Sequence, residues 1–344
     1  MNLLRQVKER VLRDLRSRQF SCASEKKTPA ELRNNNDGFD RMKHSLISKE
    51  DEVTPTVIAA MERTDNPRLK QIMASAVTHL HHFIRETRPT EEEFEAALRW
   101  IAALGHSTND TNNEVVLAAD VLGASTLIDL INNDGMQGET MSALLGPFYR
   151  GHAPDCKNGD CIARLNTPGS PLFFSGKVIS ADGTPIVGAK LDVWQASPVG
   201  LYENQDAEQP DFNLRGVFRT DDKGEFSFTS VKPAGYPVPT DGPVGDLLRA
   251  QNRAPMRPAH IHFIVSAPGH KTLVTQIFAD TPEALASDVV FGAKTQIVGD
   301  FVQHLQGDPA YPEATPLFFV CEYTFKLTRG VPTFPVPPIT GKKI

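Results

Sequence analysis

The sequence predicts an α+β protein in which a helical N-terminal part precedes an antiparallel β-sandwich. Two observations support this fold class. Between residues 54 and 132, apolar residues recur at spacings of three and four, which is the period of an amphipathic α-helix. From about residue 165 onward, short strand-like runs are separated by turn signals such as Asp-Gly and Pro-Gly. Because no helical pattern separates these runs, we expect packed antiparallel sheets rather than βαβ units.

Composition and charge exclude several classes of protein. The chain has 344 residues, of which 40% are hydrophobic and 23% charged, as in ordinary globular proteins. A net charge of −6 gives no general attraction to nucleic acid or to an anionic membrane, and no run of 18 apolar residues predicts a membrane span. Four cysteines without a C-x-x-C pair favour reduced thiols and a cytoplasmic protein.

The pattern divides the chain into four regions. We expect an N-terminal extension over residues 1–50, a helical domain over 51–140, a β-sandwich over 141–330 and a proline-rich tail over 331–344 that lies extended on a surface. The beginning of the extension is basic and amphipathic. A surface helix is the favoured interpretation, and a mitochondrial presequence is the alternative.

The helical region carries its own start signals. Thr54 followed by Pro55 predicts the beginning of one helix, and the capping box of Thr90 and Glu93 predicts the beginning of another. The helical pattern over 114–132 is apolar around much of its circumference. Such a helix is expected to be buried, and a second subunit would provide the covering surface.

The β region contains three predicted hairpins. Their turns are Asp182-Gly183, Lys223-Gly224 and Pro268-Gly269, each between two runs of alternating polarity. The last hairpin includes the segment MRPAHIHFIV, in which His260 and His262 interrupt an apolar run.

The two histidines are the first candidate functional residues. Side chains at i and i+2 of a strand point to the same face of the sheet, so His260 and His262 are expected to lie side by side. Neutral imidazoles arranged in this way can form half of a metal site. Two hydrogen-bonded histidines at a strand end are the alternative, and H-x-H by itself does not decide between them.

Two tyrosines lie in loops that lead towards this strand. Tyr202 stands in GLYENQD and Tyr236 in AGYPVPTDGPVG, both flanked by residues that fix an irregular backbone. Loops on a rigid sheet often carry functional groups. Each tyrosine taken alone would be interpreted as a surface or corner residue.

These motifs resemble those of the intradiol ring-cleavage dioxygenases. GLYENQD, AGYPVPTDGPVG and RPAHIHF carry the resemblance in the β region, and HLHHFIRETRPTEEEF and LLGPFYRG carry it further upstream. It covers roughly residues 55–305. The resemblance implies a catalytic sandwich, and a helical domain that forms a homodimer and in some members holds a lipid between subunits.

The resemblance also implies a metal centre with one Fe(III) per subunit. Its ligands would be Tyr202 and His260 in the equatorial plane, with Tyr236 and His262 axial. Tyrosinate is a hard anionic oxygen donor and therefore suits Fe(III). Tyr236 would leave the iron and accept a substrate proton, and Arg257 would stabilise charge on the substrate ring.

One further catalytic residue and a substrate pocket are implied in the same way. Gln276 would stand close to the iron and could hydrogen-bond oxygens of the reacting groups. The residues expected to contact substrate come from the helical region, the loops and the strand ends: Leu117, Asp120, Leu144, Gly146, Pro147, Phe148, Val238, Pro239, Arg257 and Val289.

Asp120 directs the choice of substrate. The hydroxyquinol branch of the family also carries Asp beside a leucine at this position, and a carboxylate can accept a hydrogen bond from a third ring hydroxyl. We therefore expect O2-dependent cleavage of hydroxyquinol (benzene-1,2,4-triol) to 3-hydroxy-cis,cis-muconate or maleylacetate. A catechol 1,2-dioxygenase that yields cis,cis-muconate, or a relative that prefers chlorocatechols, is the alternative.

Two interpretations from other classes remain. A non-catalytic β-sandwich binding module would be colourless and free of iron. A zinc hydrolase using His260 and His262 would need a nearby glutamate base, and no H-E-x-x-H motif is present.

Overall fold

The computed structural model describes residues 46–133, 138–165, 167–305 and 317–342. The chain divides into two compact units, with the boundary between Thr90 and Glu91. Most of the predicted N-terminal extension, including Cys22, lies outside the described residues. No helix within the described ranges is both long and apolar enough to cross a membrane.

The first unit contains the helix pair α2 (Glu50–Ala60) and α3 (Pro67–Thr87). The predicted helix start at Thr54 is wrong, because α2 begins at Glu50 and Pro55 lies inside it. The side chain of Glu52 accepts the backbone N–H of Lys49 at 3.1 Å and so caps an earlier turn. The hydroxyl of Thr54 instead accepts a hydrogen bond from Arg85 of α3 at 2.7 Å.

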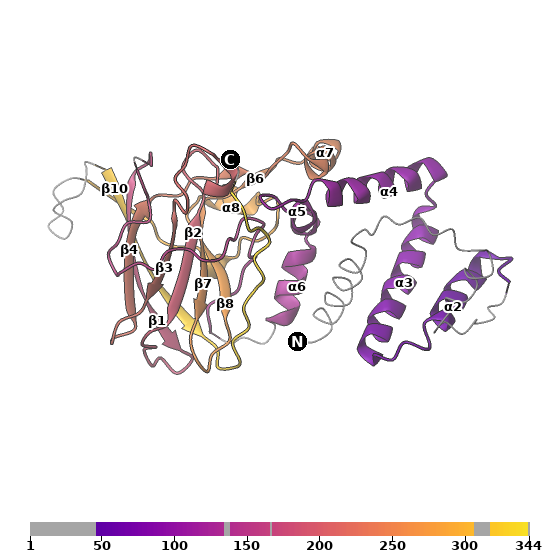
Figure 1. Cartoon of the computed structure of the whole chain (residues 1–344), viewed down its shortest axis with the longest axis horizontal. Coiled ribbons are helices and arrows are strands. Elements are labelled where there is room, and N and C mark those ends of the chain that lie inside the picture. The colour runs from indigo at the N-terminus through magenta and orange to yellow at the C-terminus, as the bar shows by residue number, and fades with distance from the viewer. Residues whose placement is uncertain (1–45, 134–137, 166, 306–316, 343–344) are drawn as a thin grey trace, which may run out of the picture. The chain divides into compact units, whose positions relative to one another are not determined.

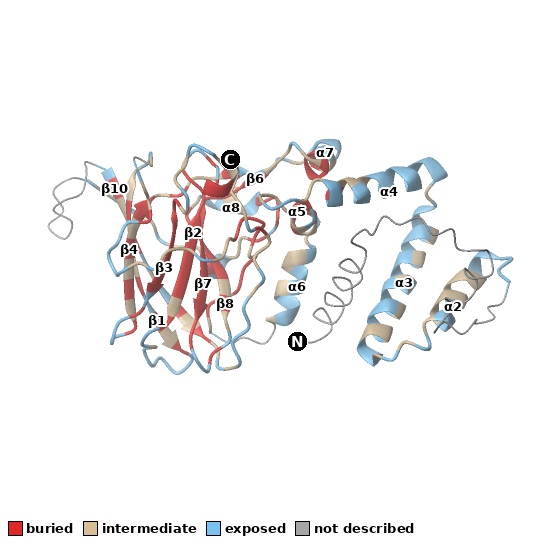
Figure 2. Cartoon of the chain, viewed as in Figure 1, coloured by how far each residue is buried: buried red, intermediate tan, exposed pale blue. Residues whose placement is uncertain are grey.

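Helix α3 buries none of its residues within this chain. Figure 2 shows its surface as exposed or intermediate along its length. Its exposed apolar side chains share one face of the helix: Ile72, Met73, Leu80, Phe83 and Ile84. We refer to these five residues as the α3 apolar face.

The second unit begins with three helices. They are α4 (Glu91–His106), which starts directly after Thr90 as the capping box predicts, α5 (Glu114–Val121) and α6 (Ala124–Asn132). Helix α5 is largely buried, and the side chain of Asn113 caps it by accepting the N–H of Val116 at 3.0 Å.

Two four-stranded sheets form the sandwich (Figure 1). The first has the order β4-β1-β10-β9, and the second β3-β2-β7-β8. All pairs are antiparallel except β1 with β10. The bounds are β1 Pro171–Ser180, β2 Lys190–Gln195, β3 Arg215–Arg219, β4 Glu225–Val231, β7 His260–Ser266, β8 Leu273–Phe278, β9 Val302–Leu305 and β10 Leu317–Leu327. The predicted α+β class with a β-sandwich is confirmed.

Of the three predicted hairpins, only the last joins two full strands of one sheet, and at Asp182-Gly183 the antiparallel pairing is limited to a bridge between Ile179 and Pro185. Strands β7 and β8 pair around Pro268-Gly269 as expected. The turns at Asp182-Gly183 and Lys223-Gly224 instead carry the chain from one sheet to the other, because β1 and β2, like β3 and β4, belong to different sheets. A turn sequence fixes a local reversal, whereas packing between the two sheets decides the partner of each strand.

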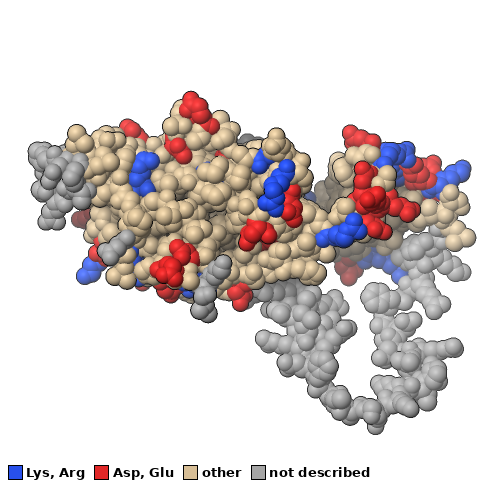
Figure 3. All heavy atoms as spheres, turned by 90° about the horizontal axis from the view of Figure 1, so that it is seen from above, with Lys and Arg blue, Asp and Glu red and all other residues tan. Residues whose placement is uncertain are grey.

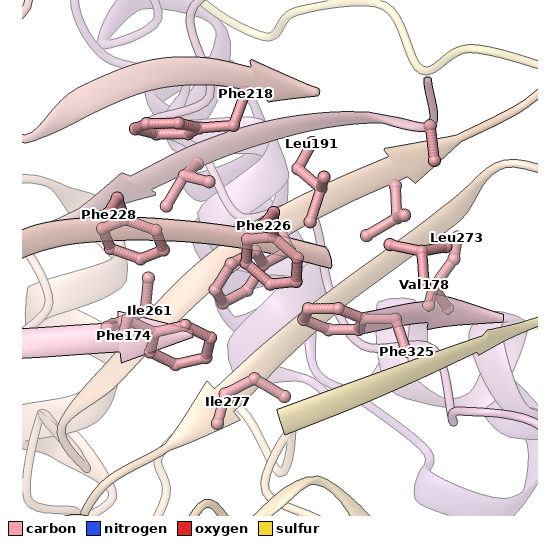
Figure 4. Packing of buried hydrophobic residues seen from close by; sticks show 14 of the residues in the cluster. Phe174, Val178, Leu191, Phe218, Phe226, Phe228, Ile261, Leu273, Ile277 and Phe325 are labelled. Carbon is pink, nitrogen blue, oxygen red and sulfur yellow. The ribbon is translucent and has the colours of Figure 1, made fainter. Parts of the chain in front are cut away.

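Aromatic side chains fill the space between the two sheets (Figure 4). Phe174 of β1 lies with its ring centroid 5.0 Å from that of Phe228 and 5.3 Å from that of Phe263 on the opposite sheet. Each such fully buried side chain contributes about 1.5–3 kcal/mol of transfer free energy. This core supports one face of β7 and leaves its other face for polar groups.

Short elements complete the second unit. They are the 3-10 helices η2 (Glu203–Gln205) and η3 (Thr295–Ile297), the two-residue strands β5 (Tyr236–Pro237) and β6 (Met256–Arg257), and the helices α7 (Pro243–Ala250) and α8 (Pro282–Ala286). On the face seen in Figure 3, Lys and Arg side chains are interspersed with Asp and Glu.

The C-terminal tail lies on the loop that precedes α5. The backbone N–H groups of Thr340 and Gly341 donate to the carbonyl of Asp110 at 3.1 and 2.9 Å. Ile339, directly before them in the chain, is only 1% exposed. Asn113, the cap of α5, also donates to the carbonyl of Pro338 at 3.4 Å. The tail therefore fixes the start of the helix that carries Leu117 and Asp120.

Candidate metal centre and substrate pocket

Strand β7 places the two histidines on one face of its sheet. Ile261 and Phe263 belong to the sandwich core, so His260 and His262 point to the opposite side. Both imidazoles are 2% exposed. The ring of Trp194 on β2, directly opposite in register, stacks on that of His262 with centroids 4.6 Å apart and 6° between the planes.

Tyr202 approaches the histidines from the loop after β2. It precedes η2, and its backbone N–H donates to Oε1 of Gln205 at 3.0 Å. Gly200 adopts a φ of +88°, and a Cβ atom there would lie 3.1 Å from Cβ of Tyr236. The glycine thus permits the two tyrosine loops to approach closely.

Tyr236 is held by the small sheet of β5 and β6. In this sheet Tyr236 lies directly opposite Arg257. Because His260 follows Arg257 by three residues, the pairing brings the phenol to the histidine strand. The ring centroids of Tyr236 and His260 are 5.6 Å apart.

The four side chains meet through their polar atoms. Oη of Tyr202 lies 3.0 Å from Oη of Tyr236, 2.9 Å from Nε2 of His262 and 3.4 Å from Nε2 of His260. The two Nε2 atoms are 3.0 Å apart. Two phenol oxygens and two imidazole nitrogens, drawn from two loops and one strand, therefore surround one point.

Burial controls the protonation of these groups. It raises the pKa of both Tyr202 and Tyr236, the former well above its usual value. It lowers the pKa of His260 to about 3 and that of His262 well below its usual value. Both imidazoles are therefore neutral at pH 7, and the phenols stay protonated unless a nearby cation stabilises the phenolates.

The tautomer of His260 favours cation binding. Its Nδ1 donates to the carbonyl of Pro258 at 2.8 Å, which leaves the lone pair on Nε2 facing the other three donors. Nδ1 of His262 has no hydrogen-bond partner among the described residues. Over those residues, no three His, Cys, Asp or Glu side chains cluster as a metal site. The phenols are therefore essential to this donor set, and a set with two phenol oxygens fits a hard cation such as Fe(III).

Arg257 reaches the same point from β6. Its Nη1 donates to Nε2 of His260 at 3.2 Å. Its Nη2 donates to Oε1 of Gln276 at 3.0 Å, and Nε2 of Gln276 donates to the carbonyl of Leu144 at 2.6 Å. Both ends of the Gln276 amide are thus engaged by protein groups.

Four of the apolar residues predicted to contact substrate belong to one hydrophobic cluster. It contains Leu117, Leu144, Val238 and Val289, together with Leu104, Ala118, Val121, Val244, Leu248 and Val290. A Cβ atom at Gly146 would lie 3.3 Å from Cε1 of His262, and the ring of Phe148 lies 4.9 Å from that of Tyr202. Pro147 is buried and Pro239 half-buried.

Asp120 is buried on α5 beside this apolar cluster. Burial raises the pKa of its carboxyl to about 6, and a hydrogen bond from Ser125 and the charge of Arg257 oppose the rise. The effect of Arg257 indicates that Asp120 and the guanidinium share one electrostatic environment. The carboxylate remains mostly ionised at pH 7.

Three residues around the site were not predicted from the sequence. Asp288 forms an ion pair with Arg257, and Arg215 on β3 forms one with Glu203, both pairs buried. The Arg215 guanidinium lies 6.0 Å from the ring of Tyr202. His260 and His262 were recognised because they are polar residues within an apolar run. Asp288 lies beside an apolar run in SDVVFGA, so the same pattern could have indicated it.

Two family models match the chain. The model described as "Dioxygenase" matches residues 144–328, and that described as "Catechol dioxygenase N terminus" matches residues 66–140. The first match alone covers more than half of the chain and includes all four convergent side chains. The chain belongs to the intradiol ring-cleavage dioxygenase family.

Individual relatives are similar over most of the chain. Hydroxyquinol 1,2-dioxygenase of Rhizobium sp. is 43% identical over 81% of this chain and 96% of its own length. Catechol 1,2-dioxygenase of Candida albicans is 40% identical over 72% of this chain and 83% of its own length. The crystal structure of hydroxyquinol 1,2-dioxygenase from Pseudomonas putida superimposes with a TM-score of 0.75 at 38% identity, covering 82% of this chain and 99% of that one.

Proposed function

We propose that this protein is an Fe(III) enzyme that cleaves hydroxyquinol between adjacent hydroxyls and incorporates both atoms of O2. One ferric ion per subunit would be held by Tyr202, Tyr236, His260 and His262. The observation that carries the proposal is the convergence of these four donors in a buried site, where Oη of Tyr202 lies 2.9–3.4 Å from the polar atoms of the other three and the two Nε2 atoms are 3.0 Å apart. The product would be 3-hydroxy-cis,cis-muconate or its tautomer maleylacetate.

The ion would supply a site that binds both catechol oxygens and prepares the ring for reaction with O2. The residues of the chain perform the remaining tasks. The Tyr236 phenolate is a base placed to accept a proton from a substrate hydroxyl. Nη1 of Arg257 is a donor for negative charge that develops on the ring and its oxygens. The cluster of Leu117, Leu144, Val238 and Val289 excludes water.

Asp120 supports the choice of hydroxyquinol. A buried carboxylate beside the pocket can accept a hydrogen bond from the third ring hydroxyl, whereas plain catechol would leave it unpaired. The similarity to enzymes named hydroxyquinol 1,2-dioxygenase supports the same substrate. Catechol and chlorocatechols are the alternative substrates within the family.

A visible absorption spectrum followed by oxygen uptake tests the proposal. Tyrosinate bound to Fe(III) absorbs in the visible region, so the purified protein should be red-brown and contain about one iron per chain. The ratio of kcat/KM for hydroxyquinol to that for catechol should exceed one. A colourless protein that consumes no O2 after loading with iron would instead favour a non-catalytic binding module.

We further propose that the protein is a cytoplasmic homodimer. The α3 apolar face gives a reason for self-association, since a second subunit would remove it from water. Cys156, Cys161 and Cys321 are free thiols, which suits a reducing compartment. Native mass spectrometry would reveal both the dimer and any lipid bound between its subunits.

A further inference from the structure

The guanidinium of Arg257 has most of its hydrogen-bond donors occupied by protein acceptors. Its Nε donates to Oδ1 of Asp288 at 3.1 Å. Its Nη2 donates to Oδ2 of Asp288 at 3.2 Å and to Oε1 of Gln276 at 3.0 Å. Because a guanidinium has five N–H groups, the two on Nη1 are the ones that bind neither Asp288 nor Gln276. Nη1 is the nitrogen that faces His260 and the candidate metal centre.

Asp288 is itself held rigidly by the backbone. Its Oδ2 accepts the N–H groups of Gly292 and Ala293 at 3.0 and 3.1 Å, and its Oδ1 accepts that of Val290 at 3.3 Å. The side chain is 2% exposed. A carboxylate fixed by three backbone donors has little freedom to follow the guanidinium, so it determines where the guanidinium lies.

We propose that Asp288 is a positioning residue, which orients Arg257 so that Nη1 is directed at substrate bound in the metal centre. This inference rests on the proposed function. Charge that develops during ring cleavage is stabilised only by donors already in place. Asp288 is not placed to touch substrate, and it acts through Arg257.

A competing carboxylate explains why such a restraint is needed. Asp120 lies close enough to Arg257 for the guanidinium charge to influence its carboxyl. Without Asp288, the charge of Asp120 would still act on the cation, and no ion pair would hold the guanidinium in its present position. The bidentate pair with Asp288 therefore keeps Arg257 at the metal centre and leaves Asp120 available to substrate.

Gly292 offers a way to disturb the pair without changing any charge. A Cβ atom at this position would lie 3.2 Å from Nη2 of Arg257 and 3.3 Å from Oδ2 of Asp288. These distances are shorter than ordinary van der Waals contact. The side chains of the pair would have to shift, while the charges and the metal ligands stay the same.

The principal test is a double-mutant cycle on the iron-loaded full-length enzyme. Asp288→Asn should lower kcat for hydroxyquinol by about 10- to 100-fold, with a smaller change in KM and with iron content and visible band retained. In an Arg257→Met background, Asp288→Asn should cause no further loss of kcat. An equal loss of kcat in both backgrounds, or an unchanged kcat in the single variant, would overturn the inference.

Gly292→Ala is the second variant. If Asp288→Asn does not fold, this variant tests whether the position of Arg257 controls kcat. It should lower kcat by about 10-fold at unchanged iron content, because small displacements of a catalytic group are costly. The matched control is Asp129→Asn, which breaks a half-buried ion pair, with Lys294 at 2.6 Å, and should leave kcat unchanged. Wild-type kcat in Gly292→Ala contradicts the inference.

The same experiment separates this inference from the proposed function. A wild-type protein that binds no iron and consumes no O2 with hydroxyquinol or catechol refutes the proposed function. An active wild type, with Asp288→Asn and Gly292→Ala both behaving like Asp129→Asn, refutes only the role of Asp288.

Discussion

Strand β7 buries polar side chains, whereas helix α3 exposes apolar ones. All seven residues of β7 are buried, including two histidines. Helix α3 is three times as long, buries none of its 21 residues and exposes five large apolar side chains on one face. Both arrangements carry a free-energy cost in an isolated chain, because buried polar groups need partners and exposed apolar surface needs cover.

The buried polar atoms of β7 and the exposed apolar surface of α3 would be stabilised by different binding partners. The polar atoms of His260 and His262 converge with two phenol oxygens, so a cation would satisfy them. The side chains of the α3 apolar face cannot bind a cation, but contact with a second protein surface would bury them. We therefore expect metal binding and catalysis in the sandwich, and self-association through α3. The following predictions test this division.

The largest effect is expected at the metal centre. Tyr202→Phe removes one phenol oxygen from a side chain that is 1% exposed and keeps its shape. Iron content and the visible band should be lost, and oxygen uptake should fall by more than about 100-fold. The measurements are iron per chain and an absorption spectrum.

Tyr323→Phe is the matched control for this variant. Tyr323 on β10 donates to the carbonyl of Gln296 at 3.0 Å, outside the convergent cluster. Its loss should cost about 1 kcal/mol of stability and leave the colour unchanged. If Tyr202→Phe keeps its full iron content, Tyr202 is not a ligand.

The second effect concerns the assembly of the helical unit. Phe83→Asp introduces a charge into the α3 apolar face, where Phe83 is 57% exposed. The proposed homodimer should dissociate, as measured by analytical ultracentrifugation, whereas bound iron should remain. Thr78→Asp lies on the opposite face of α3 by helical geometry and should leave the dimer intact. A monomeric wild type would contradict the assignment.

The third effect concerns substrate selectivity, which we attribute to Asp120 on helix α5. Asp120→Asn removes the charge of the carboxylate on α5 but keeps its size. The ratio of kcat/KM for hydroxyquinol to that for catechol should fall by about 10- to 100-fold, which is the value of one hydrogen bond to a charged group. Equal losses for both substrates would show that Asp120 stabilises the pocket rather than selecting the substrate.

The smallest effect on activity is expected from the C-terminal tail. Ile339→Ala should lower the free energy of unfolding by about 2–4 kcal/mol, because Ile339 is 1% exposed. Its contact with the loop before α5 predicts a higher KM and an unchanged kcat. The control is Val336→Ala, since Val336 is 80% exposed and should change stability by less than about 0.5 kcal/mol. Thermal unfolding and steady-state kinetics measure both quantities.

Several features of the fold and site were predictable because they depend on local sequence. The alternation of β7 placed His260 and His262 on one face, and the helical period predicted an apolar face on α3. The motifs around Tyr202 and Tyr236 indicated the family, and the family implied the metal centre. The roles of the individual site residues remain predictions that the variants above test.

Other features could not be predicted, because they depend on contacts between distant segments. The turn at Asp182-Gly183 has the sequence of a hairpin, yet β1 and β2 belong to different sheets. Thr54 has the sequence of a helix cap, yet its hydroxyl pairs with α3 while α2 begins at Glu50. In both cases the tertiary partner outweighed the local preference.

The sequence by itself determined the class of fold, the face of each amphipathic element and the chemical types of the donor side chains, since these follow from residue identity and spacing. Only the tertiary structure decided that Tyr202 and Tyr236 meet His260 and His262, and that Asp288 restrains Arg257. The physical reason is that such contacts depend on how sheets pack and loops approach. Their geometry is set by the whole unit rather than by any one segment.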